Sequence, residues 1–220
     1  MRGHPIRTHA LLLAAGAGRR MGTPKALVTG ADGEPWVVRG IRVLQAGGCD
    51  RVSVVIGADA DRVEPLVVAA GARAVVAQHW SAGMGTSLAV GLAAVQTDDP
   101  DAEVLVLMLV DLPDVDGQVV ARVLDRAAES APDVRASAVV RAAYGGSPGH
   151  PVIIGRDHWG SLAADLGGDR GARDWLSRQR VTLVECGDLA AGDDVDTPAA
   201  LARSSSAGQG SLGRIDHGSR

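Results

Sequence analysis

The chain contains no phenylalanine and a single tyrosine, so large aromatic side chains are scarce. A hydrophobic core must then consist mainly of Val, Leu, Ile and Ala, with four tryptophans as its few large side chains. Proteins that hold single-stranded nucleic acids usually stack the bases on aromatic rings. The scarcity of aromatic residues therefore argues against a base-stacking surface.

Basic residues are not in excess either. The 220 residues carry a formal net charge of -4 at pH 7, whereas a protein that binds the phosphate backbone of a nucleic acid needs a surplus of Lys and Arg to release counterions. We therefore expect no nucleic-acid partner, and any polyanion that binds must be small and held locally. The length suits one well-buried domain.

Cysteine is also rare. Neither Cys49 nor Cys186 has a second Cys or His at the spacing of a zinc site, and nothing in their positions indicates a disulfide. No apolar run approaches the length of a membrane span, and residues 1–9 are polar and too short for a signal peptide. We expect a reduced, cytoplasmic location and no membrane partner.

The most informative stretch is residues 10–25, ALLLAAGAGRRMGTPK. An apolar run ends in Gly16 and Gly18, which predicts a buried strand followed by a loop with an accessible backbone. Glycines can adopt positive φ and bring N–H groups close to an anion. Arg19, Arg20 and Lys25 follow, and they repel one another unless an anion lies between them. We interpret the loop as a phosphate site rather than as a tight turn with solvated basic residues.

Neither standard nucleotide loop fits this stretch. The dinucleotide fingerprint G-x-G-x-x-G would need glycine at the position of Met21, and Pro24 stands close to where its helix should begin. The Walker loop would need a glycine followed by Lys and then Ser or Thr, which is also absent.

The stretch does fit the pattern L-A-A-G-x-G-x-R-M-G-x-x-K, and in this it resembles the signature of nucleotidyltransferases related to molybdenum cofactor cytidylyltransferase. The resemblance implies that the loop wraps the triphosphate of a nucleoside triphosphate, with Arg20 and Lys25 as catalytic groups on the phosphates. The opening Ala-Ala-Gly implies CTP rather than GTP. The nucleotide-binding residues expected here are Leu13, Ala14, Ala15, Gly16, Gly18, Arg19, Arg20, Met21, Gly22 and Lys25.

Strand and helix patterns alternate along the rest of the chain. The alternation predicts an α/β fold with a doubly wound, mostly parallel sheet flanked by helices, in a single domain over residues 1–202. The resemblance implies the Rossmann-like nucleotidyltransferase version of this fold. Residues 203–220 are poor in apolar side chains and predict a disordered tail. We expect strands at 51–57, 74–77, 104–110, 135–140, 150–155 and 181–185, helices at 35–46, 61–70, 86–95 and 118–130, and a glycine-rich loop at 142–149.

Asp111 follows the most apolar strand, so its carboxylate is expected above the crevice where open α/β sheets bind ligands. Hard divalent cations bind carboxylates together with substrate phosphates. We therefore predict Asp111 as a catalytic Mg²⁺ ligand, the alternative being an N-cap for the next helix, a role that Asp114 or Asp116 could also fill. The motif D-x-D-T-P near the C-terminus matches the family, and the resemblance implies that Asp196 is the second metal ligand.

Three further motifs match the family. The pattern W-x-x-G-M-G-x-S-L at residues 80–88 implies nucleotide contacts, although capping of a helix by Thr86 or Ser87 is the alternative. G-H-P-V at 149–152 and G-D-R-G-A-R at 168–173 lie on the acceptor side in the family; without the resemblance, the histidine could be structural and the arginines merely solvated. The resulting predictions are Gly83, Gly85 and Ser87 for the nucleotide, and His150, Arg170 and Arg173 for the acceptor.

Together these features predict a Mg²⁺-dependent nucleotidyltransferase. The resemblance implies transfer of CMP from CTP to the phosphate of molybdopterin with release of pyrophosphate, and a molybdenum hydroxylase or its chaperone as a partner. Two alternatives stay open. One is a related transferase that acts on a sugar phosphate or another small phosphate, and the other is a non-catalytic carrier of molybdenum cofactor.

Overall fold

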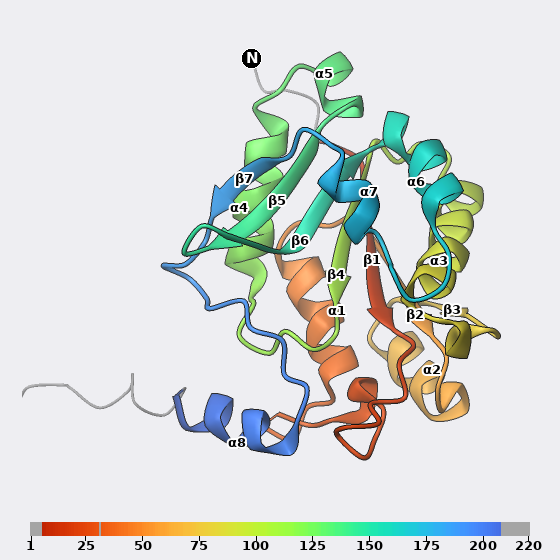
Figure 1. Cartoon of the computed structure of the whole chain (residues 1–220), viewed down its shortest axis with the longest axis vertical. Coiled ribbons are helices and arrows are strands. Elements are labelled where there is room, and N and C mark those ends of the chain that lie inside the picture. Colours follow the sequence, from red (N-terminus) through yellow and green to blue (C-terminus); the bar gives the residue numbers. More distant parts are fainter. Residues whose placement is uncertain (1–5, 31, 208–220) are drawn as a thin grey trace, which may run out of the picture.

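The computed structural model describes residues 6–30 and 32–207 and contains a seven-stranded sheet in the order β3-β2-β1-β4-β6-β5-β7 (Figure 1). β6 pairs antiparallel with β4 and β5, and the other neighbouring strands pair in parallel. The prediction of a mostly parallel sheet is confirmed. The strands are β1 (Thr8–Ala14), β2 (Arg51–Ile56), β3 (Arg73–Val76), β4 (Val104–Leu109), β5 (Val139–Tyr144), β6 (Ser147–Gly155) and β7 (Thr182–Glu185).

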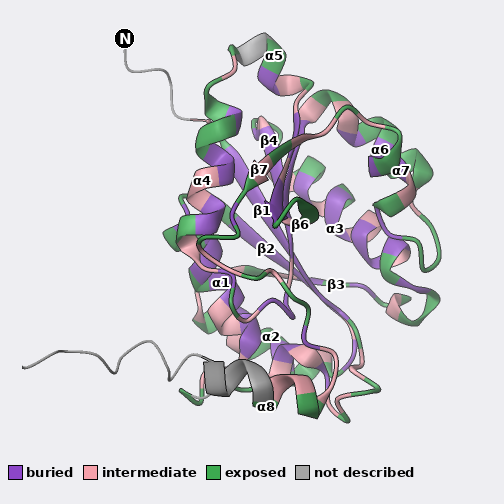
Figure 2. Cartoon of the chain, turned by 60° about the vertical axis from the view of Figure 1, so that its left-hand side comes forward, coloured by how far each residue is buried: buried purple, intermediate pink, exposed green. Residues whose placement is uncertain are grey.

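Helices cover both faces of the sheet, as predicted for a doubly wound fold. Figure 2 shows the buried strands between the two helix layers. One core lies under α1 (Trp36–Ala46), α2 (Ala60–Ala69) and α4 (Gly117–Ala128). The other lies under α3 (Met84–Asp98), α6 (Trp159–Asp165) and α7 (Arg173–Ser177). All residues of β1 are buried, because this strand lies inside the sheet with a core on each side.

Two segments differ from the sequence predictions. Residues 135–140 were expected to form a strand, but the short helix α5 (Pro132–Ala136) comes first and β5 starts at Val139. Proline at the first position of a helix has a favourable fixed φ, which explains the helix start. The expected flexible loop at 142–149 is a tight hairpin, since Gly145 and Gly146 both adopt positive φ and join β5 directly to β6.

The end of the described chain also differs from its prediction. Helix α8 (Pro198–Ala207) begins with an N–H of Ala200 donating to Thr197 Oγ1, and it continues past the predicted domain end. Residues 203–207 are therefore helical, while residues 208–220 of the predicted tail lie outside the described residues. Both cysteines are free and buried. Within the described ranges, no helix has the length and apolarity needed to cross a membrane.

Helix α3 packs on the sheet at unusually short range through Gly91. A Cβ atom at this position would lie 2.5 Å from Val55 Cγ2 and 2.8 Å from Leu11 Cδ2. We expect Gly91→Ala to lower the free energy of unfolding by about 1–3 kcal/mol, because the added methyl overpacks the core. Urea denaturation measures this. The control Gly160→Ala, in α6 with no atom within 4 Å of the new methyl, should stabilise the fold slightly; equal effects of both substitutions would contradict the close packing.

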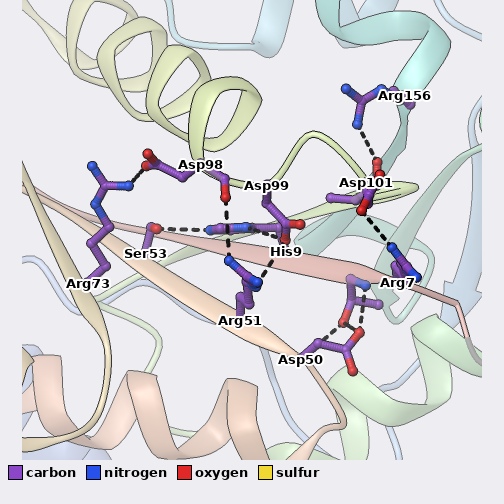
Figure 3. Close-up of polar contacts among 12 residues, drawn as sticks. Arg7, His9, Asp50, Arg51, Ser53, Arg73, Asp98, Asp99, Asp101 and Arg156 are labelled. Carbon is purple, nitrogen blue, oxygen red and sulfur yellow. Dashed lines mark hydrogen bonds and ion pairs between the residues drawn. The ribbon is translucent and has the colours of Figure 1, made fainter.

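A polar network ties the end of α3 to the amino-terminal ends of the central strands (Figure 3). The ring of His9 lies with Nδ1 3.0 Å from Asp99 Oδ2 and Nε2 2.9 Å from Ser53 Oγ. This is the order of a catalytic triad. The hydroxyl is nevertheless unreachable, because Ser53 is only 1% exposed. The network is therefore structural. It lies at the amino-terminal ends of the parallel strands, and not at their carboxyl ends, where open α/β sheets bind ligands.

This network makes stability depend on pH. Burial lowers the pKa of His9 below its ordinary value of 6.5, and Asp99 offsets this only in part. The unfolded chain therefore binds more protons here, so the free energy of unfolding is highest above the ordinary pKa and falls as the pH drops below it. Urea denaturation at about pH 5 and about pH 7.5 should show this fall, and His9→Gln should reduce it. The pKa of His150 is also lowered, so His150 adds the same pH dependence of stability to the wild type and to His9→Gln. An equal fall in the free energy of unfolding in the two proteins would therefore exclude His9 as the cause.

Candidate nucleotide and metal site

The loop after β1 has a conformation that only glycine permits at one position. Gly18 has a φ of 57°, and a Cβ there would lie 2.0 Å from the backbone oxygen of Thr23. The N–H of Met21 donates to the Gly18 oxygen and closes the turn. The loop therefore folds tightly, and Gly16 has no atom within 4 Å of where a Cβ would lie. That space is open to a ligand.

A cleft of about 500 Å³ opens next to this loop, at the carboxyl ends of β1 and β4. It is lined by the loop after β1, by small residues around the start of α3, and by acidic residues from distant parts of the chain. The predicted site residues that line it are Leu13, Ala14, Ala15, Gly16, Gly18, Arg19, Arg20, Lys25, Gly83, Ser87, Asp111 and Asp196.

Lys25 joins the acidic residues at the centre of the cleft. Its Nζ donates to Asp111 Oδ2 at 2.5 Å and also to Asp196 Oδ1. The other oxygen of Asp196 accepts from Arg20 at 2.6 Å. Lys25 and Asp196 are 171 residues apart in sequence, yet the fold places them in one ion-pair network. In Figure 1 the segment between β7 and α8, which carries Asp196, runs back toward the loop after β1.

The network shifts the pKa values of Lys25 and Asp196. Burial alone would lower the pKa of Lys25, but the hydrogen bonds that its ammonium donates to Asp111 and Asp196 outweigh burial and raise the pKa. The hydrogen bond from Lys25 lowers the pKa of Asp196, and the charges of Lys25 and Arg20 act in the same direction. At neutral pH the site therefore holds charged groups of both signs, which compensate one another.

Three carboxylates of the site have the arrangement of a cation site. Oxygens of Asp111, Asp194 and Asp196 lie within 4.8 Å of one another. Asp111 Oδ1 is buried and has no hydrogen-bond partner, which is costly for a carboxylate oxygen unless a cation is bound. The N–H of Val195 donates to the Asp111 carbonyl at 2.9 Å and fixes the two segments together. This set of oxygen ligands fits a hard divalent cation.

Asp111 does not cap a helix. The N-cap of α4 is Asp116, whose Oδ1 accepts from the N–H groups of Gln118 and Val119. Asp114 instead accepts from the N–H groups of Ala191 and Gly192, and so it holds the segment that leads to Asp194. The carboxylate of Asp111 is therefore left for the cleft.

Gly83 and Gly85, at the start of α3, pack so closely against residues 167–169 that neither position has room for a side chain. A Cβ at Gly83 would lie 2.4 Å from Asp169 Oδ1, and one at Gly85 would lie 2.8 Å from the Gly167 oxygen. The N–H of Gly85 donates to the Gly168 oxygen at 2.8 Å. Neither Thr86 nor Ser87 caps α3, which begins after Gly83. The glycines serve loop docking, and this docking carries Asp169 into the cleft.

Several predicted residues lie outside the cleft lining. Met21, Gly22 and Gly85 support the loops without lining the cleft, and the three predicted acceptor residues do not line it either. Arg170 has an 81% exposed side chain and pairs with Asp174. His150 is half-buried on β6, in a cis peptide bond with Pro151, and Arg173 is exposed on α7. The roles of these residues stay predictions.

Sequence reasoning missed other residues of the cleft. Trp80 and Met84 belong to the same motif as Gly83, so the motif itself could have indicated them. Asp169 belongs to the G-D-R-G-A-R motif, but it does not cap α7, which begins after Ala172 and without a side-chain cap. The additional lining residues are Ala17, Trp80, Ser81, Met84, Leu109, Val110 and Asp169.

The parallel strands, the glycine-rich loop over their carboxyl ends and the facing cations and carboxylates define an α/β protein of the nucleotide-transfer class. The chain belongs to the MobA-like NTP transferase domain family, whose model matches residues 10–183. The resemblance to nucleotidyltransferases of molybdenum cofactor, predicted from the loop motif, is confirmed at the level of this family.

Individual relatives cover most of the chain. Nicotine blue oxidoreductase of Paenarthrobacter nicotinovorans is 36% identical over 197 residues, which span 85% of this chain and 91% of that protein. The crystal structure of Rv0371c from Mycobacterium tuberculosis H37Rv matches with a TM-score of 0.73 and 29% identity, and covers 92% of this chain and 100% of that one. A second structure, of Rv0371c in complex with manganese, matches with a TM-score of 0.69 and 29% identity over 90% of this chain and 97% of that one.

Proposed function

We propose that this protein transfers a nucleoside monophosphate from a nucleoside triphosphate to a small acceptor that carries a phosphate. The proposal rests above all on one observation, the meeting of the Lys25 ammonium with the carboxylates of Asp111 and Asp196 beside the glycine-rich loop. Nucleotidyl transfer from a nucleoside triphosphate needs positive charge next to carboxylates that can together bind a divalent cation, and this cleft offers both.

In the proposed reaction an acceptor phosphate oxygen forms a bond to the α-phosphorus as the bond to the pyrophosphate oxygen breaks. The bonding electron pair leaves with pyrophosphate. A phosphate dianion is already a nucleophile, so no side chain has to remove a proton. The protein has to align the two phosphates and neutralise the developing charge. Arg20, Lys25 and the backbone N–H groups of the loop after β1 would do this.

The proposed cofactor is a divalent cation, with Mg²⁺ as the physiological ion. Asp111 and Asp196 would hold it, with Asp194 as a third ligand, because their oxygens already converge. When bound, such an ion polarises phosphate oxygens and stabilises the leaving group. The manganese complex of Rv0371c supports a divalent ion in this family. Lys25 would release the carboxylates and turn its ammonium toward the phosphates.

For the substrates we propose CTP and the phosphate of molybdopterin. The methyl group of Ala15 lines the cleft at the position where the loop motif implies a choice between CTP and GTP. The experiment is pyrophosphate release from each nucleoside triphosphate with isolated molybdenum cofactor and Mg²⁺. Turnover with CTP is the expected result. Turnover with GTP alone would reject CTP as the donor, and turnover only with a sugar phosphate would reject molybdopterin as the acceptor.

One further result would point to another function. Nucleotide binding by calorimetry without any product would favour a carrier of molybdenum cofactor, which would deliver it to a molybdenum hydroxylase or its chaperone. The predicted cytoplasmic location fits either role and stays a prediction.

An oxidoreductase is the second candidate function. The observation that favours it is the 36% identity to nicotine blue oxidoreductase over most of both chains. A reduced nicotinamide nucleotide and nicotine blue, followed by dye absorbance, test it directly. Loss of absorbance at a rate that survives Asp111→Asn would favour dye reduction over nucleotidyl transfer, since the proposed metal site would then be dispensable.

A further inference from the structure

Asp194 and Asp196 lie in a stretch of chain without regular secondary structure. Residues 191–196, which we call the acidic segment, form neither helix nor strand, and Asp194 is exposed. The proposed metal site nevertheless needs their carboxylates beside Asp111, which lies directly after β4 and Val110. Since no helix or sheet ladder holds the acidic segment, other hydrogen bonds must set the position of its carboxylates.

Asp114 provides two of these hydrogen bonds. Its Oδ2 accepts from the N–H of Ala191 at 2.7 Å and from the N–H of Gly192 at 2.9 Å. Such bonds to a charged acceptor are stronger than those between neutral groups. Further along the acidic segment, the N–H of Val195 donates to the Asp111 carbonyl at 2.9 Å. Because Asp111 and Asp114 belong to one short loop, residues 111–115, this loop holds the acidic segment at two points.

Arg39, on α1, binds the same loop. Its Nε donates to the Pro113 carbonyl at 3.0 Å, and its Nη2 donates to the Pro113 carbonyl at 2.5 Å and to the Val115 carbonyl at 3.2 Å. These two carbonyls flank Asp114 in sequence. Within the described ranges they are the only partners of the guanidinium, which forms no ion pair. Arg39 therefore ties the loop that carries Asp114 to α1.

We propose that Asp114 and Arg39 are positioning residues of the proposed metal site. Arg39 fixes the loop that follows Asp111, and Asp114 fixes the acidic segment against that loop, so that the three carboxylates converge. Neither residue lines the cleft, and both act through the carboxylates that would bind the ion. Groups that orient metal ligands in this way change metal affinity by about 10–100-fold. The inference rests on the proposed function and goes beyond it, because it adds two residues outside the cleft.

Two substitutions of Asp114 separate its hydrogen bonds from its charge. Asp114→Ala removes both, whereas Asp114→Asn removes the charge and keeps an oxygen that can accept from Ala191 and Gly192. Mn²⁺ titration of the nucleotide-free full chain by electron paramagnetic resonance should show an affinity about tenfold weaker in Asp114→Ala. The affinity of Asp114→Asn should stay close to that of the wild type. Equal weakening in both variants would overturn the inference, because loss of charge alone would then explain it.

Amide hydrogen exchange reads the position of the acidic segment without any metal. Exchange at the N–H of Val195, followed by NMR, should be faster in Asp114→Ala and unchanged in Asp114→Asn. Arg39→Met should also speed this exchange and weaken Mn²⁺ binding, because the loop loses three hydrogen bonds. Arg42→Met is the matched control on α1, since Arg42 pairs with Glu34, and it should change neither measurement.

The outcomes separate this inference from the proposed function. Asp114 is exposed, so its substitutions should leave the protein folded. Wild-type Mn²⁺ affinity in Asp114→Ala or in Arg39→Met would overturn the role of the residue changed and leave the proposed function intact. If the wild type itself binds no Mn²⁺, the proposed metal site fails. Faster exchange at Val195 in Asp114→Ala would then still show that Asp114 holds the acidic segment, and unchanged exchange would overturn the inference as well.

Discussion

Lys25→Met is expected to reduce pyrophosphate release by about 10²–10³-fold, because the cleft loses a cation that would stabilise the departing phosphates. The same substitution should tighten binding of Mn²⁺ to the nucleotide-free protein, on the order of tenfold. The ammonium now bonds to both Asp111 and Asp196 and competes with a metal ion for them. Steady-state kinetics and Mn²⁺ titration by electron paramagnetic resonance measure the two effects.

The chain offers sharp controls for this result. Lys25→Arg keeps the charge and should leave Mn²⁺ affinity near that of the wild type. Arg42→Met removes an exposed cation that pairs with Glu34, and should change neither measurement. Lys25 is the sole lysine of the sequence, so acetylation of amines should reproduce the effects of Lys25→Met. Weaker Mn²⁺ binding in Lys25→Met would show that the ammonium does not compete with the ion.

Much of the fold was predictable because buried parallel strands carry continuous apolar runs. The strands predicted at 104–110 and at 51–57 correspond to β4 and β2, each one residue shorter than expected. The strand predicted at 135–140 starts too early because Arg135 lies in helix α5 and Val139 in strand β5. Apolar and polar residues alternate less clearly in these two elements. Arg135 is buried and forms an ion pair with Glu103. Local periodicity does not reveal this contact, because Glu103 lies in another part of the chain.

The separate parts of the site were predictable from their own motifs, and Asp111 and Asp196 line the cleft together with the glycine-rich loop. The glycine-rich loop could be identified because its cations are neighbours in sequence. The contacts of Lys25 with two carboxylates could not, because they join residues 86 and 171 positions apart.

Asp111→Asn is expected to reduce pyrophosphate release by about 10³-fold, because the loss of a metal ligand removes several kcal/mol of transition-state stabilisation. Asp111 contributes a buried oxygen without a partner, and a neutral amide there would bind a divalent ion poorly. The stabilisation by Mn²⁺ in thermal unfolding should also disappear, since a ligand stabilises the fold only as far as it binds.

A comparison among the neighbouring acids locates the ion. Asp196→Asn should weaken Mn²⁺ binding as well, although its side chain is more exposed than that of Asp111. Asp194→Asn should have a smaller effect, because this residue is exposed. Asp193→Asn alters an exposed acid outside the three-carboxylate group, and should retain both turnover and the Mn²⁺-dependent stabilisation. If Asp111→Asn keeps the stabilisation while Asp193→Asn loses it, the ion binds elsewhere and the proposed arrangement of the cleft is wrong.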